Sequence, residues 1–263
     1  MSRTVIPSVK ATYVEGAITH DTVWTLVDSP FVVSNDITVY SNATLTIEPG
    51  VEVKFGGYFS LIVAGRLFAN GTSRTIEFTS NREQPALGDW NAVRFTGTQK
   101  STIIDCVFAY AQNAISVENG NVEIVNSTIN FSQNAVTATD GILSIQNSTV
   151  SQCADDGINL TSTNAAILNN VITGNRGNGI CATGNGPTYI QGNDIVSNSI
   201  GVLLSGSQLS DAIIFQNTIS ASAMSGIQIE ASGFNNVTIN KNNIVSNDNG
   251  FYVLSSTSPY ITD

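Results

Sequence analysis

Two adjacent carboxylates, Asp155 and Asp156, are the residues whose types and spacing come nearest to a catalytic pair. Paired carboxylates serve glycoside hydrolysis as general acid and as base or nucleophile, so they would suit an enzyme that acts on a carbohydrate. The only histidine of the chain, His20, lies far upstream and does not complete such a site. Asp156 also stands 22 residues after Asn134 and 22 before Asn178, which favours a structural position at a repeated corner.

A second candidate is a cluster of charged residues around Trp90. Its basic members are Lys54, Arg66, Arg74, Arg82, Arg94 and Lys100. Trp90 and Arg94 would form a small polar binding site, with the indole ring as a platform. The alternative is a mixed-charge surface beneath a loop that Trp90 holds against the rest of the protein.

Four apolar side chains are expected to share one outward face, because they flank inward isoleucines on successive strands. They are Leu168, Tyr189, Ile213 and Phe215. A stacked block of exposed apolar residues can mark a contact surface for a partner subunit or for a sugar ring. The alternative is that loops of the same chain, at 183–187 and 205–211, cover this face.

The elements that position these residues follow a repeat of about 22 residues. An apolar pair with one residue between its members recurs as Ile115/Val117, Val136/Ala138, Ile158/Leu160, Ile180/Ala182, Val202/Leu204, Ile227/Ile229 and Phe251/Val253. A second apolar column runs from Ile124 to Ile239, and a third runs from Val107 through Ile129 to Ile244. Three short strands in each of about ten coils predict an all-β fold, a three-faced parallel β-helix.

Polar residues recur at fixed places in each repeat and indicate its corners. Two residues before the third strand stand Asp105, Ser127, Ser148, Asn170, Asn193, Asn217 and Asn242. Two residues before the first strand stand Asn113, Asn134, Asp156, Asn178, Ile200, Ser225 and Asn249. Asn and Asp tolerate left-handed backbone angles, and stacked amides can bond along the axis, so we expect side-chain ladders at these corners.

The net charge and the distribution of basic residues limit the classes of ligand that the protein is expected to bind. Only 11% of residues are charged and the net charge is −10, which argues against a nucleic-acid partner. From residue 101 onward Arg176 and Lys241 are the only basic residues, against eleven acidic ones. A groove for an acidic polysaccharide would need Arg or Lys, so a glycan ligand, if there is one, is expected to be neutral or weakly charged.

The cysteine positions and the hydropathy of the chain predict no disulfide, no bound metal and no membrane insertion. Cys106, Cys153 and Cys181 fall in different columns of the repeat, so we expect small buried side chains and no disulfide. Metal-ligand spacing is lacking, and neither a metal nor another cofactor is expected. We expect no membrane insertion, because no run reaches the length of a transmembrane helix.

The two ends of the chain do not follow the repeat. Residues 1–34 are expected to form an N-terminal cap, with Trp24 packed over the open end of the first coil. The β-helix would then occupy residues 35–263, with an inserted loop at 79–89. After Phe251/Val253 too few residues remain for another strand, so we expect the last coil to be covered by further chain or by a second molecule.

The chain also resembles a known group of proteins. The runs SNATLTIEPGVEVKFGG, LIVAGRLFANGTSRTIEFTS and GDWNAVRF are similar to the opening of right-handed parallel β-helix domains of secreted and surface-anchored bacterial and archaeal proteins, in the pectate-lyase-like superfamily. The later NSTI, NSTV, GNDI and QNTI runs resemble the repeats of that superfamily. The resemblance covers residues 35–255 and implies a right-handed β-helix in an extracellular or cell-surface setting.

These observations favour a non-catalytic structural or adhesive module of a larger surface protein, whose partners are other copies of itself or neighbouring surface domains. We therefore expect no catalytic residues. The alternatives are a carbohydrate-active enzyme (hydrolase, lyase or epimerase) with Asp155 and Asp156 as its carboxylates, or a glycan-binding module that uses Tyr189 and Phe215.

Overall fold

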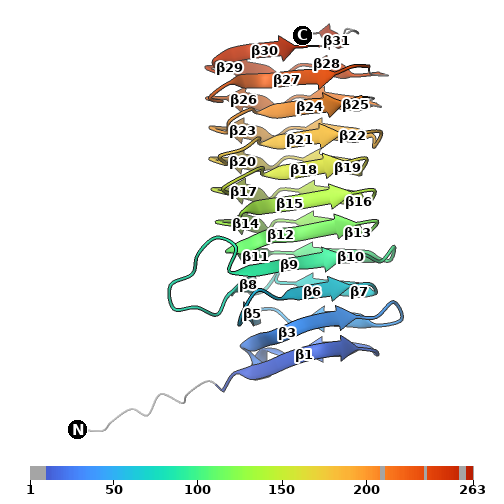
Figure 1. Ribbon diagram of the computed structural model, residues 1–263, viewed down its shortest axis with the longest axis vertical. Helices are drawn as coiled ribbons and strands as arrows, with labels where there is room; N and C mark the ends of the chain where they lie inside the picture. Colours follow the sequence, from blue (N-terminus) through green and yellow to red (C-terminus); the bar gives the residue numbers. More distant parts are fainter. Residues whose placement is uncertain (1–9, 208–210, 234–235, 255–258, 263) are drawn as a thin grey trace, which may run out of the picture.

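The computed structural model describes residues 10–207, 211–233, 236–254 and 259–262. The chain winds into one stack of parallel coils, with strand β1 (Thr12–Ile18) at one end and strands β30 (Asn249–Val253) and β31 (Tyr260–Thr262) at the other (Figure 1). Each complete coil contributes one strand to each of three faces. No helix in the described part of the chain is long and apolar enough to cross a membrane.

The strands divide among the three faces as follows. The first face carries β1, β3 (Phe31–Val39), β6 (Ser60–Val63), β9 (Trp90–Phe95), β12 (Ala111–Glu118), β15 (Asn134–Thr139), β18 (Ile158–Thr161), β21 (Ile180–Thr183), β24 (Val202–Gly206), β27 (Ser225–Ala231) and β30. The second face carries β2 (Thr22–Trp24), β4 (Thr44–Ile47), β7 (Arg66–Asn70), β10 (Lys100–Ile104), β13 (Asn121–Val125), β16 (Ile142–Gln146), β19 (Asn164–Leu168), β22 (Thr188–Gln191), β25 (Ala212–Phe215), β28 (Thr238–Asn240) and β31. The third face begins with residues 12–14 of β1 and 31–33 of β3, the latter of which pair with β5. It carries β5 (Glu52–Phe55), β8 (Ile76–Ser80), β11 (Cys106–Ala109), β14 (Thr128–Asn130), β17 (Thr149–Ser151), β20 (Val171–Thr173), β23 (Asp194–Val196), β26 (Thr218–Ser220) and β29 (Asn243–Val245). A short 3-10 helix, η1 (Leu26–Asp28), follows β2.

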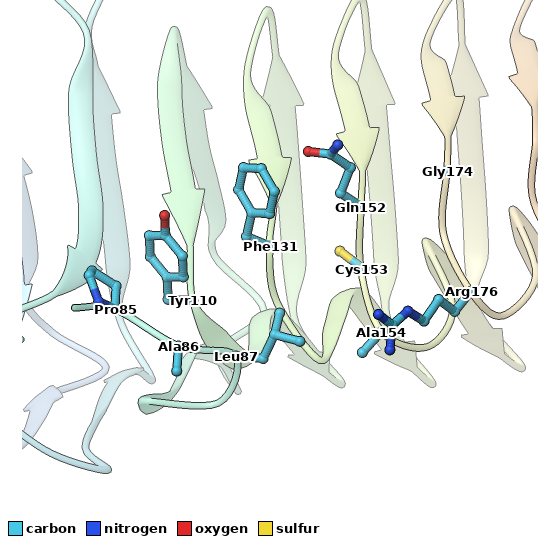
Figure 2. A pocket seen from close by; sticks show the side chains of 10 residues that line it. All are labelled: Pro85, Ala86, Leu87, Tyr110, Phe131, Gln152, Cys153, Ala154, Gly174 and Arg176. Atoms are coloured by element: carbon cyan, nitrogen blue, oxygen red, sulfur yellow. The ribbon is translucent and has the colours of Figure 1, made fainter.

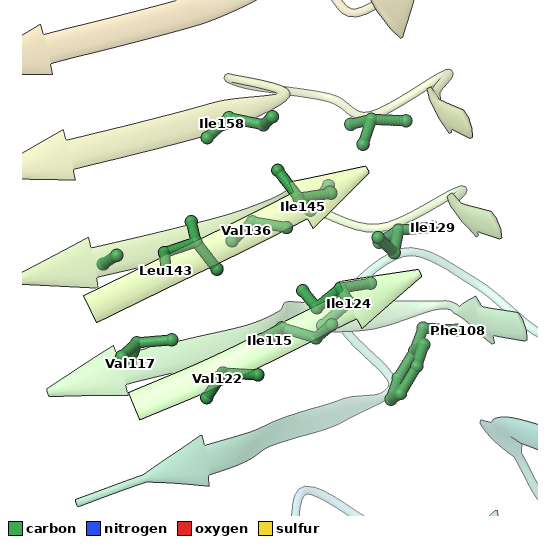
Figure 3. Close-up of a cluster of buried hydrophobic side chains, with 14 of the residues drawn as sticks. Phe108, Ile115, Val117, Val122, Ile124, Ile129, Val136, Leu143, Ile145 and Ile158 are labelled. Atoms are coloured by element: carbon green, nitrogen blue, oxygen red, sulfur yellow. The ribbon is translucent and has the colours of Figure 1, made fainter. Parts of the chain in front are cut away.

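Each strand pairs in parallel with its equivalent in an adjacent coil, so equivalent residues stack on one another. Ile115 pairs with Val136, and Val136 pairs with Ile158, as the repeat predicts. Figure 3 shows these side chains filling the interior between the faces. Burying each such aliphatic side chain contributes about 1.5–3 kcal/mol before entropy is counted, which explains why the inward columns hold almost only aliphatic and aromatic residues.

The polar ladder at the corner between the second and third faces is confirmed. The side chain of each member accepts hydrogen bonds from the equivalent residue of the preceding coil. Oδ1 of Asn193, for example, accepts from the N–H of Asn170 at 2.8 Å and from its Nδ2 at 3.0 Å. The ladder runs through Ser127, Ser148, Asn170, Asn193, Asn217 and Asn242. These bonds satisfy backbone groups that the corners would otherwise leave buried without partners.

The start of the third column differs by one residue from the prediction. Phe108, and not Val107, points inward, because its ring stacks on that of Phe78 with centroids 4.4 Å apart. Cys106, and not Asp105, therefore occupies the ladder position, where its N–H donates to Oγ of Ser127. Left-handed backbone angles belong to the residue before each ladder position, such as Asp105 with φ 51°.

The corner between the third and first faces carries a ladder of other residues than the predicted column, in which Asn134 donates to Asn113 and Asn178 donates to Asp156. The members of this other ladder are Ser132, Cys153, Asn175, Asn198, Ser222 and Asn247. Oδ1 of Asn198, for example, accepts from the N–H of Asn175 at 3.1 Å. Cys106, Cys153 and Cys181 occupy three different columns, buried and unpaired, as the spacing predicts.

Both ends correct the sequence-based expectation. Residues 12–24 are not a separate cap but a further coil, because β1 pairs with β3 and β2 pairs with β4. Within the described residues, the second face consequently has eleven strands. Trp24 is buried against Phe31, while residues 1–9 lie outside the described part. At the other end β31 pairs with β28, so the final residues do form a strand, contrary to expectation.

Candidate functional site

Asp155 and Asp156 differ in burial and in hydrogen bonding. Asp156 is buried, and its Oδ1 accepts hydrogen bonds from the N–H (2.7 Å) and Nδ2 (2.9 Å) of Asn178. Its Oδ2 accepts from Nδ2 of Asn159 at 2.9 Å, whereas Asp155 is exposed. Burial raises the pKa of Asp156 above its ordinary value, against the opposing effect of the hydrogen bond from the Asn178 backbone. The carboxylate thus lies in the corner column that its spacing indicates.

Asp156→Asn is expected to stabilise the protein at pH 7 by on the order of 1 kcal/mol. The neutral amide keeps an oxygen that accepts from the N–H and Nδ2 of Asn178. Its Nδ2 takes the place of the oxygen that accepts from Asn159, whose own amide can turn its oxygen toward this new donor. The folded-state pKa of Asp156 is raised, so the buried ionised carboxylate lowers the free energy of unfolding at neutral pH. This loss of stability disappears as pH falls below the unfolded-state pKa. The advantage should therefore shrink between pH 7 and about pH 4, as measured by urea unfolding at both. A less stable variant at pH 7, or loss of a polysaccharide-cleaving activity of the parent, would contradict this structural role.

Trp90 is not an exposed platform. Its side chain is fully buried, its ring stacks on Phe55 at 4.1 Å, and its Nε1 donates to the carbonyl of Ala109 at 2.8 Å. Arg94 forms a bidentate ion pair with Glu118 on the first face. The prediction of Trp90 as an exposed platform is therefore wrong, and the alternative of a tryptophan that holds the loop agrees with the structure.

The predicted apolar face is less continuous than expected. Tyr189 lies beside Ile213 in adjacent coils, but Gln191 separates Leu168 from Phe215 in their column. Of the four apolar side chains only Ile213 is exposed, and the others are half-buried. Nζ of Lys241 lies 5.8 Å from the centroid of the Phe215 ring. A contact surface here stays a prediction.

A groove that the sequence did not indicate runs along the corner between the third and first faces. We call it the corner groove, and it has a volume of about 660 Å³. Its lining residues are Pro85, Ala86, Leu87, Tyr110, Phe131, Gln152, Cys153, Ala154, Gly174 and Arg176. Figure 2 shows Tyr110, Phe131 and Gln152 along one side, with the loop residues and the Arg176 guanidinium along the other.

One wall is a column of residues with left-handed backbone angles, each directly after a third-face strand. This left-handed column consists of Tyr110, Phe131, Gln152, Gly174, Ser197, Ala221 and Ser246. The Tyr110 and Phe131 rings lie 6.0 Å apart at an interplanar angle of 13°, and both turn a face toward the viewer in Figure 2. The Phe131 side chain is 38% exposed. Bulky residues seldom adopt these angles, so the two rings occupy a strained part of the backbone.

The opposite wall is the loop between β8 and β9, which spans 81–89 because Thr79 and Ser80 belong to β8. The loop projects from the stack in Figure 1. Asp89 closes it: its Oδ2 accepts from Oγ of Ser80 (2.8 Å) and from the N–H of Ala86 (2.9 Å). Its Oδ1 lies 2.9 Å from Nη1 of Arg82. These contacts place Pro85, Ala86 and Leu87 at the groove.

Comparison with known proteins identifies the fold family. A family model described as the right handed beta helix region matches residues 113–263, which is more than half of the chain. The chain belongs to this family. The coils show a parallel β-helix, and the family match shows that it is right-handed.

Two solved β-helix structures resemble it across most of its length. The periplasmic alginate epimerase AlgG matches with a TM-score of 0.61 and 14% identity, over 93% of this chain and 83% of AlgG. The A-module of the Azotobacter vinelandii mannuronan C-5 epimerase AlgE6 matches with a TM-score of 0.50 and 14% identity, over 92% of this chain and 87% of the module. At such identity these likenesses show the fold alone. No curated protein matches the sequence.

The side chains that line the corner groove have chemistry that would suit binding of a sugar. Aromatic faces offer an apolar surface to the C–H groups of a sugar ring, and an amide and a guanidinium can bond to its substituents. Arg176 is exposed and forms no ion pair with any described residue. Neither a carboxylate nor a histidine lines the groove. In the described ranges, no group of three His, Cys, Asp or Glu side chains is placed to hold a metal ion.

The spacing of the lining residues in the sequence indicates part of the corner groove. Tyr110, Phe131 and Gln152 stand 21 residues apart, and Gly174 follows after 22, the same interval as the ladders. The interval could have shown that they stack on one another. It could not have shown that loop 81–89 lies opposite them.

Proposed function

We propose that this β-helix recognises a polysaccharide in the corner groove and works outside the cytoplasm or at the cell surface. The observation that carries the proposal is the near-parallel pair of aromatic rings, Tyr110 and Phe131, on left-handed backbone. Further along the same groove lies the Arg176 guanidinium, which forms no ion pair with any residue that the structure describes. The carbohydrate alternative thereby gains support over the structural or adhesive role that the sequence favours.

The fold itself does not require aromatic residues in the left-handed column. Equivalent places in later coils hold Gly174, Ser197 and Ala221, and a bulky residue there is strained by on the order of 1–3 kcal/mol. A half-exposed ring recovers little of this penalty by burial. Strained residues that add little stability cluster at functional sites, so a ligand that stacks on the rings would account for both.

Charge supports an acidic glycan, in contrast to the neutral one that the overall composition suggests. Arg176 is one of two basic residues after residue 101, and its side chain runs back along the groove toward Ala154 in Figure 2. A guanidinium binds a carboxylate through two parallel hydrogen bonds. The proteins AlgG and AlgE6, whose folds this chain shares, are named for alginate and mannuronan, which are acidic polysaccharides.

Phe131→Gly tests the proposal. It should weaken binding of polymannuronate about tenfold, because loss of ring stacking removes roughly 1–1.5 kcal/mol. The free energy of unfolding should change by less than about 1 kcal/mol, since glycine relieves the left-handed strain while the Tyr110 contact is lost. Titration calorimetry and thermal unfolding measure the two quantities.

Ala221→Gly is the matched control, because Ala221 has φ 54° in the same column but lies outside the groove. It should leave binding unchanged. If Phe131→Gly binds polymannuronate as well as the parent does, the glycan lies elsewhere. If the parent binds neither polymannuronate nor neutral β-1,4-mannan, the proposed function is refuted.

A further inference from the structure

We infer that the C-terminal coil of one molecule receives the N-terminal coil of a second copy, so that β-helices stack head to tail. In this contact residues 12–14 of the second copy lie on β29, residues 16–18 on β30, and β2 on β31. The two surfaces are the opposite ends of the stack in Figure 1. The inference goes beyond glycan binding and does not depend on it.

The C-terminal coil exposes inward side chains of a kind that the preceding coil buries. Phe251 is 40% exposed and Val253 is 43% exposed. Ile227 and Ile229, their partners in the preceding coil, are fully buried. Ile261, the inward residue of β31, is 47% exposed. A row of exposed core residues marks a surface that another apolar surface stabilises by covering it.

The backbone of the same coil is suited to a partner made of parallel strands. Among the described residues, β29, β30 and β31 each pair on one side only, with β26, β27 and β28. Such free edges recruit further strands. A Cβ on Gly226 would meet the carbonyl oxygen of Gly250 at 2.9 Å, whereas a Cβ on Gly250 would meet only Cγ2 of Ile244, at 4.0 Å. The space over Gly250 therefore has room for the backbone of a further coil.

The first coil offers the matching surface at the other end of the stack. Among the described strands, β1 pairs with β3 alone and β2 pairs with β4 alone. A cavity of about 410 Å³ lies at this end, and the inward residues Val14, Ile18 and Trp24 border it. After β31 the next face in the winding is the third, which residues 12–14 of the second copy supply. The spiral path thus passes from one molecule to the other without a change of register.

The inward side chains of the two ends are complementary in size. Gly16 and Phe251 lie at the two ends of the column of Ile115, which has an aliphatic residue in every coil between them. In the head-to-tail contact Phe251 faces Gly16, and Val253 faces Ile18. A Cβ added to Gly16 would meet nothing within 4 Å, so the place opposite the Phe251 ring is empty. This fit favours a second copy over a contact between two C-terminal ends, where two Phe251 rings would meet.

A head-to-tail contact does not close on itself, so it produces linear oligomers. The cross-section of one coil is small for a specific interface, so we expect a dissociation constant of about 100 μM. Sedimentation equilibrium of the parent should show a monomer at about 10 μM, and dimers and longer species at about 500 μM.

Two variants, each altered at one end, and their mixture test the contact. Val253→Lys places a charge in the C-terminal coil, and Ile18→Lys places one in the N-terminal coil, so each variant alone should stay monomeric at about 500 μM. An equimolar mixture should form a 1:1 complex and nothing longer, because Ile18→Lys keeps an intact C-terminal end and Val253→Lys keeps an intact N-terminal end. Its dissociation constant should lie within about threefold of the parent's.

Tyr252→Lys and Ala17→Lys are the matched controls, because they add the same charge to the same strands at outward positions. Both should associate as the parent does. A melting temperature within about 5 °C of the parent's shows that a lysine variant is folded. If one is not folded, Val253→Thr or Ile18→Thr replaces it and should weaken association at least about threefold.

Three results would overturn the inference. The first is a parent that is monomeric at every concentration, and strong hydrogen-exchange protection of β30 in that monomer would show that its own chain covers the end. The second is self-association of Ile18→Lys, which would indicate contact between two C-terminal ends. The third is a mixture of folded variants that forms no complex. None of these results affects the proposed function, which the Phe131→Gly variant tests.

Discussion

Asn193→Ala is expected to lower the free energy of unfolding by about 3–5 kcal/mol, because several buried groups lose their partners at once. Oδ1 of Asn193 accepts from the N–H and the Nδ2 of Asn170, and its Nδ2 donates to the carbonyl of Ile167 (2.9 Å) and to Oδ1 of Asn217 (2.9 Å). Asn193 is 1% exposed, so water does not readily reach the groups that lose these bonds, and leaving them unpaired costs free energy.

Asn169→Gly is the matched control for this ladder prediction. Asn169 is the neighbour of Asn170 in the chain, is exposed, and has φ 55°, an angle that glycine adopts freely. Its replacement should change stability by less than about 1 kcal/mol. Urea unfolding measures both variants, and hydrogen exchange at the Asn170 amide reports local opening if the coils do not unfold in one step. A loss below 1 kcal/mol for Asn193→Ala would show that the ladder contributes little.

Trp90→Ala is the second substitution with a large expected effect, a loss of about 3–5 kcal/mol. It would leave a cavity beside Phe55 and remove the hydrogen-bond donor from the Ala109 carbonyl. Because Trp90 follows the loop directly, we also expect faster tryptic cleavage after Arg82 and weaker binding of polymannuronate, whose groove the loop borders.

Trp90→Phe separates packing from hydrogen bonding. It keeps an aromatic ring against Phe55 and should cost about 1–2 kcal/mol through the unpaired carbonyl and the smaller ring. Thermal unfolding and the rate of cleavage are the measurements. If Trp90→Ala kept the parent's stability but abolished glycan binding, the indole would be an exposed platform, and its buried position in the structure would be contradicted.

The repeat made most of the fold predictable from the sequence. Each coil has the same cross-section, so an inward residue such as Ile145 must be apolar in every repeat, and a corner residue such as Asn193 must bond to its neighbours along the axis. The prediction was wrong where two adjacent apolar residues competed. At Val107 and Phe108 the interval allowed either, and the stacking of Phe108 on Phe78 decided between them.

The site was much less predictable. Trp90 looked like a binding residue because its chemistry suits one, yet its burial depends on contacts with Phe55 and Ala109, which lie 35 and 19 residues away. Asp156 was recognisable as a corner residue from spacing alone, because its neighbours in the column are separated by whole repeats.

Sequence by itself therefore determined what depends on periodicity: the parallel coils, the inward columns and the main polar ladder. Only the tertiary structure showed which outward side chains lie opposite a segment that does not repeat. Loop 81–89 folds back beside Tyr110 and Phe131 because Asp89 is held by Ser80, Ala86 and Arg82. A repeat cannot encode that position, since the loop occurs once and its contacts are made by single side chains rather than by a stacked column.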